Sequence, residues 1–208
     1  MNSNFINRFL IATIIGPIIL LLIFLGNNYF LFLILFLFFV GIYEIIILKN
    51  TLSKIIIFFI FLYFLYSCLK IENLTNGKTY LYFILFVTWL SDLGGYVVGK
   101  SVGGRKIGII SPNKTFSGMF GSILFSYISI FFIEYYKIFS FESLISQLII
   151  ITFSSLIVII GDLFFSYLKR INNIKDYSKI LGGHGGLFDR IDGLIFLTIF
   201  FNIFIDII

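Results

Sequence analysis

The stretch 166–192 reads SYLKRINNIKDYSKILGGHGGLFDRID, and apolar sequence surrounds it on both sides. It holds five Lys or Arg side chains, the single histidine, three aspartates and two pairs of glycines. Cations, carboxylates and paired glycines between two apolar helices indicate a site where phosphates and a metal ion meet at a membrane surface.

The composition of the whole chain places it in a bilayer. Of its 208 residues 60% are hydrophobic and 12% are charged, whereas soluble domains average about 45–50% apolar and about 25% charged residues. We therefore predict an all-α fold, a polytopic transmembrane helical bundle that forms one integral membrane domain over residues 1–208. The net charge of +5 fits cytoplasmic loops, and the chain has no basic soluble segment for nucleic acid.

Seven apolar segments each come near the roughly 17–25 residues that a spanning helix needs. Ile55–Leu69 is the shortest, and with 15 residues it must borrow polar flanks to cross the membrane. The seven segments are Phe9–Leu25, Tyr29–Leu48, Ile55–Leu69, Tyr80–Val98, Ser117–Ile133, Leu144–Phe165 and Leu187–Ile208.

The basic residues gather on one side of this seven-helix arrangement. That side comprises the amino terminus and the connections 49–54, 100–116 and 166–186, and it carries eleven of them. The opposite side carries three. This asymmetry places the amino terminus and both glycine-rich loops in the cytoplasm and the carboxyl terminus outside. The eleven are Arg8, Lys49, Lys54, Lys100, Arg105, Lys106, Lys114, Lys169, Arg170, Lys175 and Lys179, against Lys70, Lys78 and Lys137.

Four aspartates lie near the cytoplasmic ends of predicted helices, at about one depth. Asp92 is in the fourth helix and Asp162 in the sixth, while Asp189 and Asp192, at i and i+3, begin the seventh. A carboxylate inside a membrane costs roughly 2.5–3.5 kcal/mol on insertion scales, so such residues pair, line a polar cavity or bind a cation. A single one could be a packing or capping acid, but four together favour a functional site.

Polar residues of the sixth helix share one face. Asp162, Ser166, Lys169 and Arg170 follow the i, i+4, i+7 and i+8 spacing. A carboxylate at the base of this ladder and cations above it suit a metal-bound triphosphate. Oxygen ligands, without a set of Cys and His side chains, favour Mg²⁺ over zinc.

A second polar segment, 91–118, reads SDLGGYVVGKSVGGRKIGIISPNKTFSG. Its glycines could be packing notches between helices, but the four cations among them indicate a further role.

The glycine-rich loop Gly182–Gly186 has two interpretations as well. It could form an anion-binding nest before the amino terminus of the last helix, or a flexible turn.

The order S-x-x-K-R-x4-K-D-x4-L-G-G-H-G-G-x-x-D-R-x-D from Ser166 to Asp192 resembles the signature of the phosphatidate cytidylyltransferase (CDP-diglyceride synthase) family. The segment 91–118 is similar to the upstream block of that family, at Asp92, Gly95–Tyr96, Gly99–Lys100 and Ser111–Thr115. The resemblance covers Trp89–Gly193 well and residues 1–79 hardly at all, so residues 80–208 would form the catalytic part.

The resemblance implies a Mg²⁺-dependent nucleotidyltransferase of phospholipid biosynthesis, which condenses CTP with phosphatidic acid to CDP-diacylglycerol and diphosphate. It implies a multi-pass protein of the bacterial inner membrane with its active site facing the cytoplasm. A homodimer and a second cation are left open. The implied catalytic residues are Asp162, Asp189, Lys169, Arg170 and His184. The implied metal ligands are Asp162 and Asp189, with Asp192 near any second cation. The implied substrate-binding residues are Asp92, Lys100, Lys114, Ser166, Lys175, Asp176, Gly185, Gly186 and Arg190.

Three roles are open for His184: to bind phosphate, to protonate the leaving diphosphate, or to satisfy the loop backbone. The chain also departs from the family at Phe116, Ser117 and Phe165, where the family commonly has Trp, an acidic or amide residue, and Glu. Two other functions remain. One is another CTP-dependent lipid nucleotidyltransferase or phosphotransferase, and the other is a small membrane transporter, although transporter sites lie near the midplane and often in repeated halves.

The charge asymmetry predicts that the carboxyl terminus is outside. A reporter fused after Ile208 is therefore expected to be active only in its periplasmic form, because alternate connections of a seven-helix chain lie on opposite sides. Parallel fusions of a periplasmic and a cytosolic reporter measure this. Activity of the cytosolic reporter alone would mean that the helix count has the wrong parity.

Overall fold

A computed structural model describes residues 15–108, 111, 114–139, 143–180 and 185–204. Their regular structure is helical, which confirms the predicted all-α, polytopic class. A helix over Ile15–Leu25 comes first. It is followed by α2 (Asn27–Ile47), α3 (Thr51–Glu72), α4 (Gly77–Val102), α5 (Phe116–Ser126), the 3₁₀ turn η1 (Tyr127–Ser129), α6 (Ile130–Tyr136), α7 (Leu144–Ile171) and α8 (Phe188–Phe204).

Each of the seven predicted segments contains a helix, and five helical stretches are long and apolar enough to cross a membrane. The helix α3 has 22 residues, so the 15-residue segment Ile55–Leu69 borrows polar flanks, as expected. Its extra first turn is polar and begins at a cap, in which the Asn50 side chain accepts a hydrogen bond from the Ser53 N–H at 2.9 Å. Hydropathy alone clips such polar ends, whereas the cap satisfies an amide that would otherwise lack a partner.

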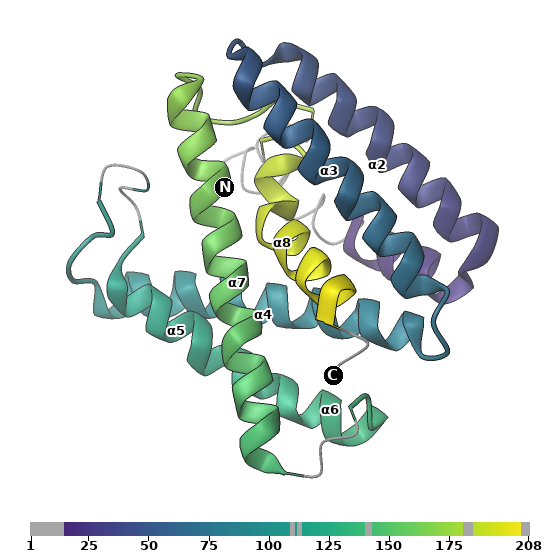
Figure 1. Ribbon diagram of the computed structural model, residues 1–208. Coiled ribbons are helices and arrows are strands. Elements are labelled where there is room, and N and C mark those ends of the chain that lie inside the picture. The colour runs from purple at the N-terminus through teal and green to yellow at the C-terminus, as the bar shows by residue number, and fades with distance from the viewer. Residues whose placement is uncertain (1–14, 109–110, 112–113, 140–142, 181–184, 205–208) are drawn as a thin grey trace, which may run out of the picture.

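The helix α8 lies between α3 and α7, with α2 outside α3 and with α4 crossing the bundle (Figure 1). Aromatic rings fill the contacts on both ends of α8. Near its start the Phe188 ring lies 5.1 Å from the ring of Phe61 in α3, and near its end the Phe201 ring lies 5.7 Å from that of Phe83 in α4. All four side chains are fully buried. The last helix is therefore fixed in the centre of the bundle, which sets the position of the aspartates at its start.

The helices α4 and α5 approach so closely that their backbones touch. A Cβ atom at Gly94 would lie 2.6 Å from the Phe125 Cβ and would overlap the carbonyl of Gly121. A Cβ at Gly118 would lie 2.9 Å from the carbonyl oxygen of Gly95. Small residues on both faces are what permits such contact between membrane helices. Gly94 and Gly95 are thus packing notches between α4 and α5, as one of the two interpretations of this segment expected.

Gly94→Ala is expected to destabilise the protein by about 1–3 kcal/mol, because the added methyl group must displace the α5 backbone. The matched control is Gly16→Ala, where a Cβ would meet nothing within 4 Å and alanine favours the helix. Thermal unfolding in detergent compares the two. A Gly94→Ala midpoint at or above that of Gly16→Ala would contradict the close contact of α4 and α5.

Candidate active site

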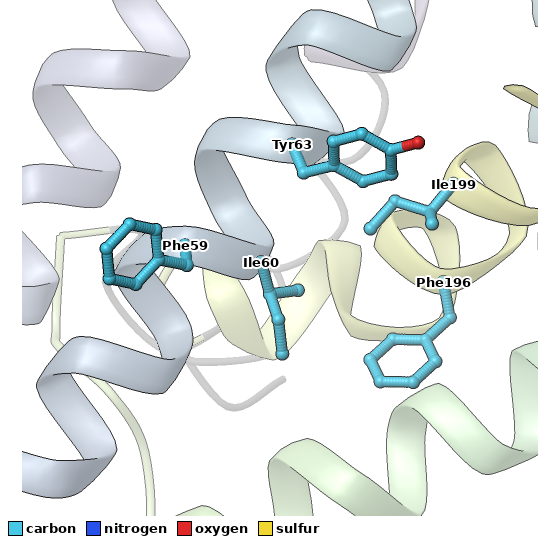
Figure 2. Close-up of a pocket in the computed structure, with 5 residues that line it drawn as sticks. All are labelled: Phe59, Ile60, Tyr63, Phe196 and Ile199. Atoms are coloured by element: carbon cyan, nitrogen blue, oxygen red, sulfur yellow. The ribbon is translucent and has the colours of Figure 1, made fainter.

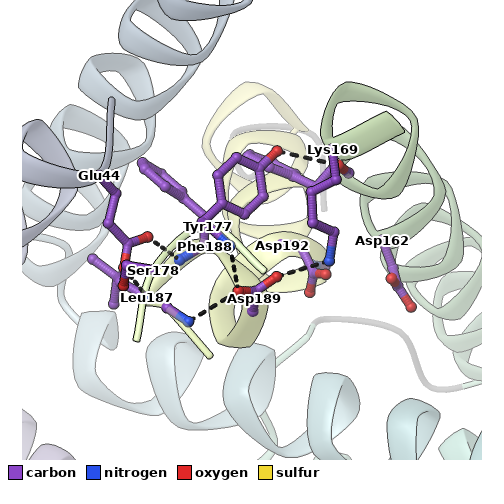
Figure 3. A network of polar contacts seen from close by, with 12 residues as sticks. Glu44, Asp162, Lys169, Tyr177, Ser178, Leu187, Phe188, Asp189 and Asp192 are labelled. Carbon is purple, nitrogen blue, oxygen red and sulfur yellow. Dashed lines mark hydrogen bonds and ion pairs between the residues drawn. The ribbon is translucent and has the colours of Figure 1, made fainter. Parts of the chain in front are cut away.

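The carboxylate of Asp189 ties the α7–α8 connection together. Its Oδ1 accepts a hydrogen bond from the Lys169 ammonium at 2.7 Å, and its Oδ2 accepts the Tyr177 N–H at 2.8 Å and the Gly186 N–H at 2.9 Å (Figure 3). Only 6% of its side chain is exposed. The preceding Gly185 has φ +82°, where a Cβ would lie 2.8 Å from Oδ2. Glycine is the residue that adopts such a positive φ most readily.

A second ion pair joins the polar segment 91–118 to α7, a few residues before the polar segment 166–192. Lys114, from the connection between α4 and α5, pairs with the Oδ2 of Asp162 in α7. The position of Lys114 follows from the start of α5, where the neighbouring Thr115 is the N-cap and its hydroxyl accepts the Gly118 N–H at 3.1 Å. Residues about fifty positions apart therefore meet at one place, as expected if both segments serve one site.

The surroundings of Lys114 define the rest of the cluster. Burial lowers the pKa of Lys114 from its ordinary value, the carboxylates of Asp192 and Asp92 act to raise it, and the Lys169 charge lowers it. These groups lie close enough to interact electrostatically, and Arg190 interacts with Asp92 in the same way. Because a charge on any of them acts on the others, the cluster responds to a bound ion as a unit.

Figure 3 shows Asp162 on α7 and Asp189 and Asp192 at the start of α8. The Asp192 Oδ1 accepts the N–H of the adjacent Gly193 at 2.9 Å. We call the set of seven charged residues on α4, α7, α8 and the α4–α5 connection the charged cluster. Its members are Asp92, Lys114, Asp162, Lys169, Asp189, Arg190 and Asp192.

The donor set of the charged cluster suits one mode of magnesium binding. Within the described residues no three His, Cys, Asp or Glu side chains gather into an all-protein metal cage. Mg²⁺ is, however, usually held by one or two carboxylates together with substrate phosphates and water. Asp162 and Asp192, on adjacent helices beside Lys114, fit that mode. Asp189 fits it less well, because both of its oxygens already accept hydrogen bonds.

A groove of about 370 Å³ opens between α3 and α8 (Figure 2). Its lining is formed by Phe59, Ile60, Tyr63, Phe196 and Ile199. These side chains are apolar or aromatic, so the groove offers hydrocarbon contact and no charge for phosphate. This lining does not suit a nucleotide or a metal ion.

The comparison with protein families places the same helices in a known group. The family model of the cytidylyltransferases matches residues 46–208. This chain belongs to the cytidylyltransferase family. The matched region contains α4, α7 and α8, and so it includes every member of the charged cluster.

Relatives of this cytidylyltransferase-family protein carry the name phosphatidate cytidylyltransferase. The chain is 37% identical to the one of Bacillus subtilis (strain 168) over 142 residues, and 36% identical to that of Staphylococcus aureus (strain COL) over 133 residues. Each alignment covers 64% of this chain. It covers 49% of the Bacillus subtilis protein and 51% of the Staphylococcus aureus protein. The chain thus spans about half the length of the curated relatives it matches.

Not all residues predicted for the site belong to the charged cluster. Lys100 contacts Tyr96, with its Nζ 5.5 Å from the centre of the ring. Lys175 and Asp176 are exposed on the α7–α8 connection, and Arg170 is exposed at the end of α7. Ser166 is buried in α7. His184 lies outside the described residues, so its role stays a prediction.

The structure adds three residues that the sequence did not assign to the site, namely Glu44, Tyr177 and Ser178. Ser178 donates its hydroxyl to the Glu44 Oε1 at 2.6 Å. Burial raises the pKa of Tyr177 above its ordinary value, and the Asp189 charge raises it further. The Tyr177 hydroxyl donates to the Phe165 carbonyl at 3.1 Å. Glu44 had a usable signal, because it is a lone acid in the apolar segment Tyr29–Leu48.

The departure at Phe165 has a structural counterpart. The Phe165 ring is fully buried and stacks on Phe188, with ring centres 5.7 Å apart and an angle of 15° between the planes. It also lies 6.0 Å from the Tyr177 ring. Where the family commonly has a glutamate, this chain thus has an aromatic contact that supports the start of α8.

Lys169→Met is expected to destabilise the protein by about 3–5 kcal/mol, because Asp189 would remain buried without its cation. Lys54→Met is the matched control. Its ammonium is on the surface, where it donates to the Ile46 carbonyl, and its loss should change stability by no more than about 0.5 kcal/mol. Chemical unfolding in detergent measures both. Equal stabilities would show that Asp189 does not need Lys169.

Proposed function

We propose that this protein is a phosphatidate cytidylyltransferase, which joins CTP and phosphatidic acid to CDP-diacylglycerol and releases diphosphate. The observation that carries the proposal is the meeting of the two polar segments in the charged cluster, where Lys114 pairs with Asp162 and lies close enough to Lys169 and Asp192 to interact with their charges. The names of the relatives support the choice of substrates. Because this chain covers only half of those proteins, the activity needs its own test.

The reaction is an in-line displacement at phosphorus. A phosphate oxygen of phosphatidic acid attacks the α-phosphorus of CTP, the bond from the α-phosphorus to the bridging oxygen breaks, and diphosphate leaves with the electron pair. No protein nucleophile is required, so positioning and charge neutralisation supply the catalysis. Lys114 and Lys169 stand ready for this, since each can exchange its carboxylate partner for a phosphate oxygen. Arg170, at the end of α7, and Arg190, at the start of α8, add positive charge.

The sequence predicts Asp162 and Asp189 as ligands of Mg²⁺, with Asp192 near any second cation. We propose instead that Asp162 and Asp192 would hold the ion, because both oxygens of Asp189 already accept hydrogen bonds. When bound, Mg²⁺ would neutralise phosphate charge and orient the triphosphate. Asp92 and Arg190 would then balance the charge around the ion. The role of Asp189 in this scheme is to keep Lys169 and the α7–α8 connection in place.

The site has a natural orientation in the membrane. The charged cluster lies at the ends of α7 and α8 that the charge asymmetry places on the cytoplasmic side of a bacterial inner membrane. CTP would enter from the cytosol and phosphatidic acid from the bilayer. A transporter would place its site near the middle of the membrane, so this alternative has no supporting observation. Another CTP-dependent lipid transferase would use the same cluster, and only its acceptor would differ.

The purified protein in nanodiscs is expected to convert labelled CTP and phosphatidic acid to labelled CDP-lipid when Mg²⁺ is present. Asp162→Asn should lower turnover at least about a hundredfold, because it removes a charge that binds the ion without a change in size. Glu134→Gln is the matched control, since Glu134 accepts a hydrogen bond from Gln147 far from the cluster. Thin-layer chromatography of the lipids measures the product.

Three outcomes would contradict parts of the proposal. Absence of CDP-lipid from the wild-type protein would reject the function, and a labelled product from a lipid alcohol alone would favour the phosphotransferase alternative. Wild-type turnover of Asp162→Asn at limiting Mg²⁺ would reject the metal assignment.

A further inference from the structure

Glu44, in α2, is a completely buried carboxylate that reaches the α7–α8 connection. Its Oε1 accepts the Ser178 hydroxyl at 2.6 Å and the Leu187 N–H at 2.6 Å, and its Oε2 accepts the Phe188 N–H at 3.0 Å (Figure 3). The sequence separations to Leu187 and Phe188 are 143 and 144 residues. An ionisable side chain in an apolar helix is expensive to bury, so three short hydrogen bonds from the catalytic part of the chain suggest a defined task.

Two glycines make room for the Glu44 side chain, one on α2 and one before α8. At Gly41, one turn before Glu44, a Cβ atom would overlap the Phe61 ring, so this glycine allows α2 to lie close against α3. At Gly186 a Cβ atom would overlap the Glu44 carboxylate itself. Glycine is therefore needed on both sides of the contact, on α2 and on the segment that α2 reaches.

A second side chain ties the same two parts of the chain together. Asn172, just after α7, is buried, and its Oδ1 accepts the Lys49 N–H at 3.2 Å and the Asn50 N–H at 2.9 Å. The turn between α2 and α3 is thereby fixed to the end of α7. With this anchor in place, Glu44 contacts the start of α8 from a rigid base.

The negative charge of Glu44 lies at the positive end of the α8 dipole. Leu187 and Phe188 supply the first free N–H groups of α8, which form the positive end of the helix dipole. The Glu44 carboxylate satisfies both, while Asp189, the next residue, accepts the N–H groups of Gly186 and Tyr177. Two carboxylates from different helices thus divide the polar backbone groups of this turn between them.

We propose that Glu44 is a positioning residue of the site. It holds the first turn of α8 and so sets where Asp189 and Asp192 lie relative to α7. The inference rests on the proposed function for its catalytic consequence, but not for the contact itself. Glu44 lies two residues before the region 46–208 that the family model matches, so the proposal gives the first helices a part in the site.

The contact is tested by hydrogen–deuterium exchange on the detergent-solubilised protein. Glu44→Gln keeps one acceptor oxygen, but its NH₂ group would face the Phe188 N–H, so that one hydrogen bond is lost. Exchange of the Phe188 amide is expected to become about tenfold faster or more. Glu72→Gln is the control, because the Glu72 Oε1 accepts the Asn27 N–H at 3.0 Å at the far end of α3. It should leave Phe188 unchanged.

The catalytic consequence is tested on the same variants by the assay for CDP-lipid. Glu44→Gln should lower kcat about tenfold while KM for CTP stays within about threefold, since Glu44 itself touches no substrate. Glu44→Asp, which keeps the charge, should recover part of kcat. A variant with a merely structural loss would instead show less folded protein with the kcat of the wild type.

Ser178→Ala gives a milder variant in case Glu44→Gln does not fold. It removes one of three donors and should raise the exchange rate at Leu187 and Phe188 less than Glu44→Gln does. Unchanged exchange in both variants would overturn the contact. Faster exchange with unchanged kcat would overturn the positioning role. If the wild type makes no CDP-lipid, the proposed function fails, and the exchange data still decide whether Glu44 holds α8.

Discussion

A carboxylate buried among membrane helices needs a partner, and in this protein the partners come from distant parts of the chain. Asp162 is paired with Lys114 across two helices, Asp189 with Lys169 across the α7–α8 connection, and Glu44 with backbone amides at the start of α8. The Lys169–Asp189 pair and the Glu44 contacts would be costly to break, because Asp189 or Glu44 would stay buried and unpaired, whereas Lys114 and Asp162 keep 31% and 25% of their side chains exposed. The arrangement of α2, α4, α7 and α8 is therefore constrained by the same groups that we propose for chemistry.

The residues that make the helices predictable are not the residues that make the site. Long apolar runs require helices, because only a helix satisfies its own backbone in a bilayer, and this was enough for the fold class. The two polar segments could also be recognised in the sequence, and their aspartates were predicted to lie at about one depth in the membrane. The need of the third segment for polar flanks was predicted, but the exact start of α3 was not, because its first turn is polar and depends on the Asn50 cap, which hydropathy does not register.

The pairing within the site could not be read from the sequence. Spacing on α7 puts Asp162 and Lys169 on one face, but it does not say that Lys114 takes the first and Asp189 the second. The first choice depends on the close approach of α4 to α5 at their glycines, because Lys114 lies in the connection between these helices, and the second depends on how α8 packs against α7. The part played by Glu44 depends on a further contact, that of α2 with α3 at Gly41. Neither contact leaves a periodic pattern in the sequence.

The balance of charge bears on how such a site could accept its substrates. The charged cluster has four carboxylates, Asp92, Asp162, Asp189 and Asp192, against three cations, Lys114, Lys169 and Arg190. A triphosphate and a lipid phosphate would add further negative charge at this place, where the low dielectric of the membrane strengthens repulsion. If a divalent cation enters with the nucleotide, it offsets that charge and releases Lys114 and Lys169 toward phosphate oxygens. The excess of acids over bases thus supports the proposal that Mg²⁺ and CTP bind together.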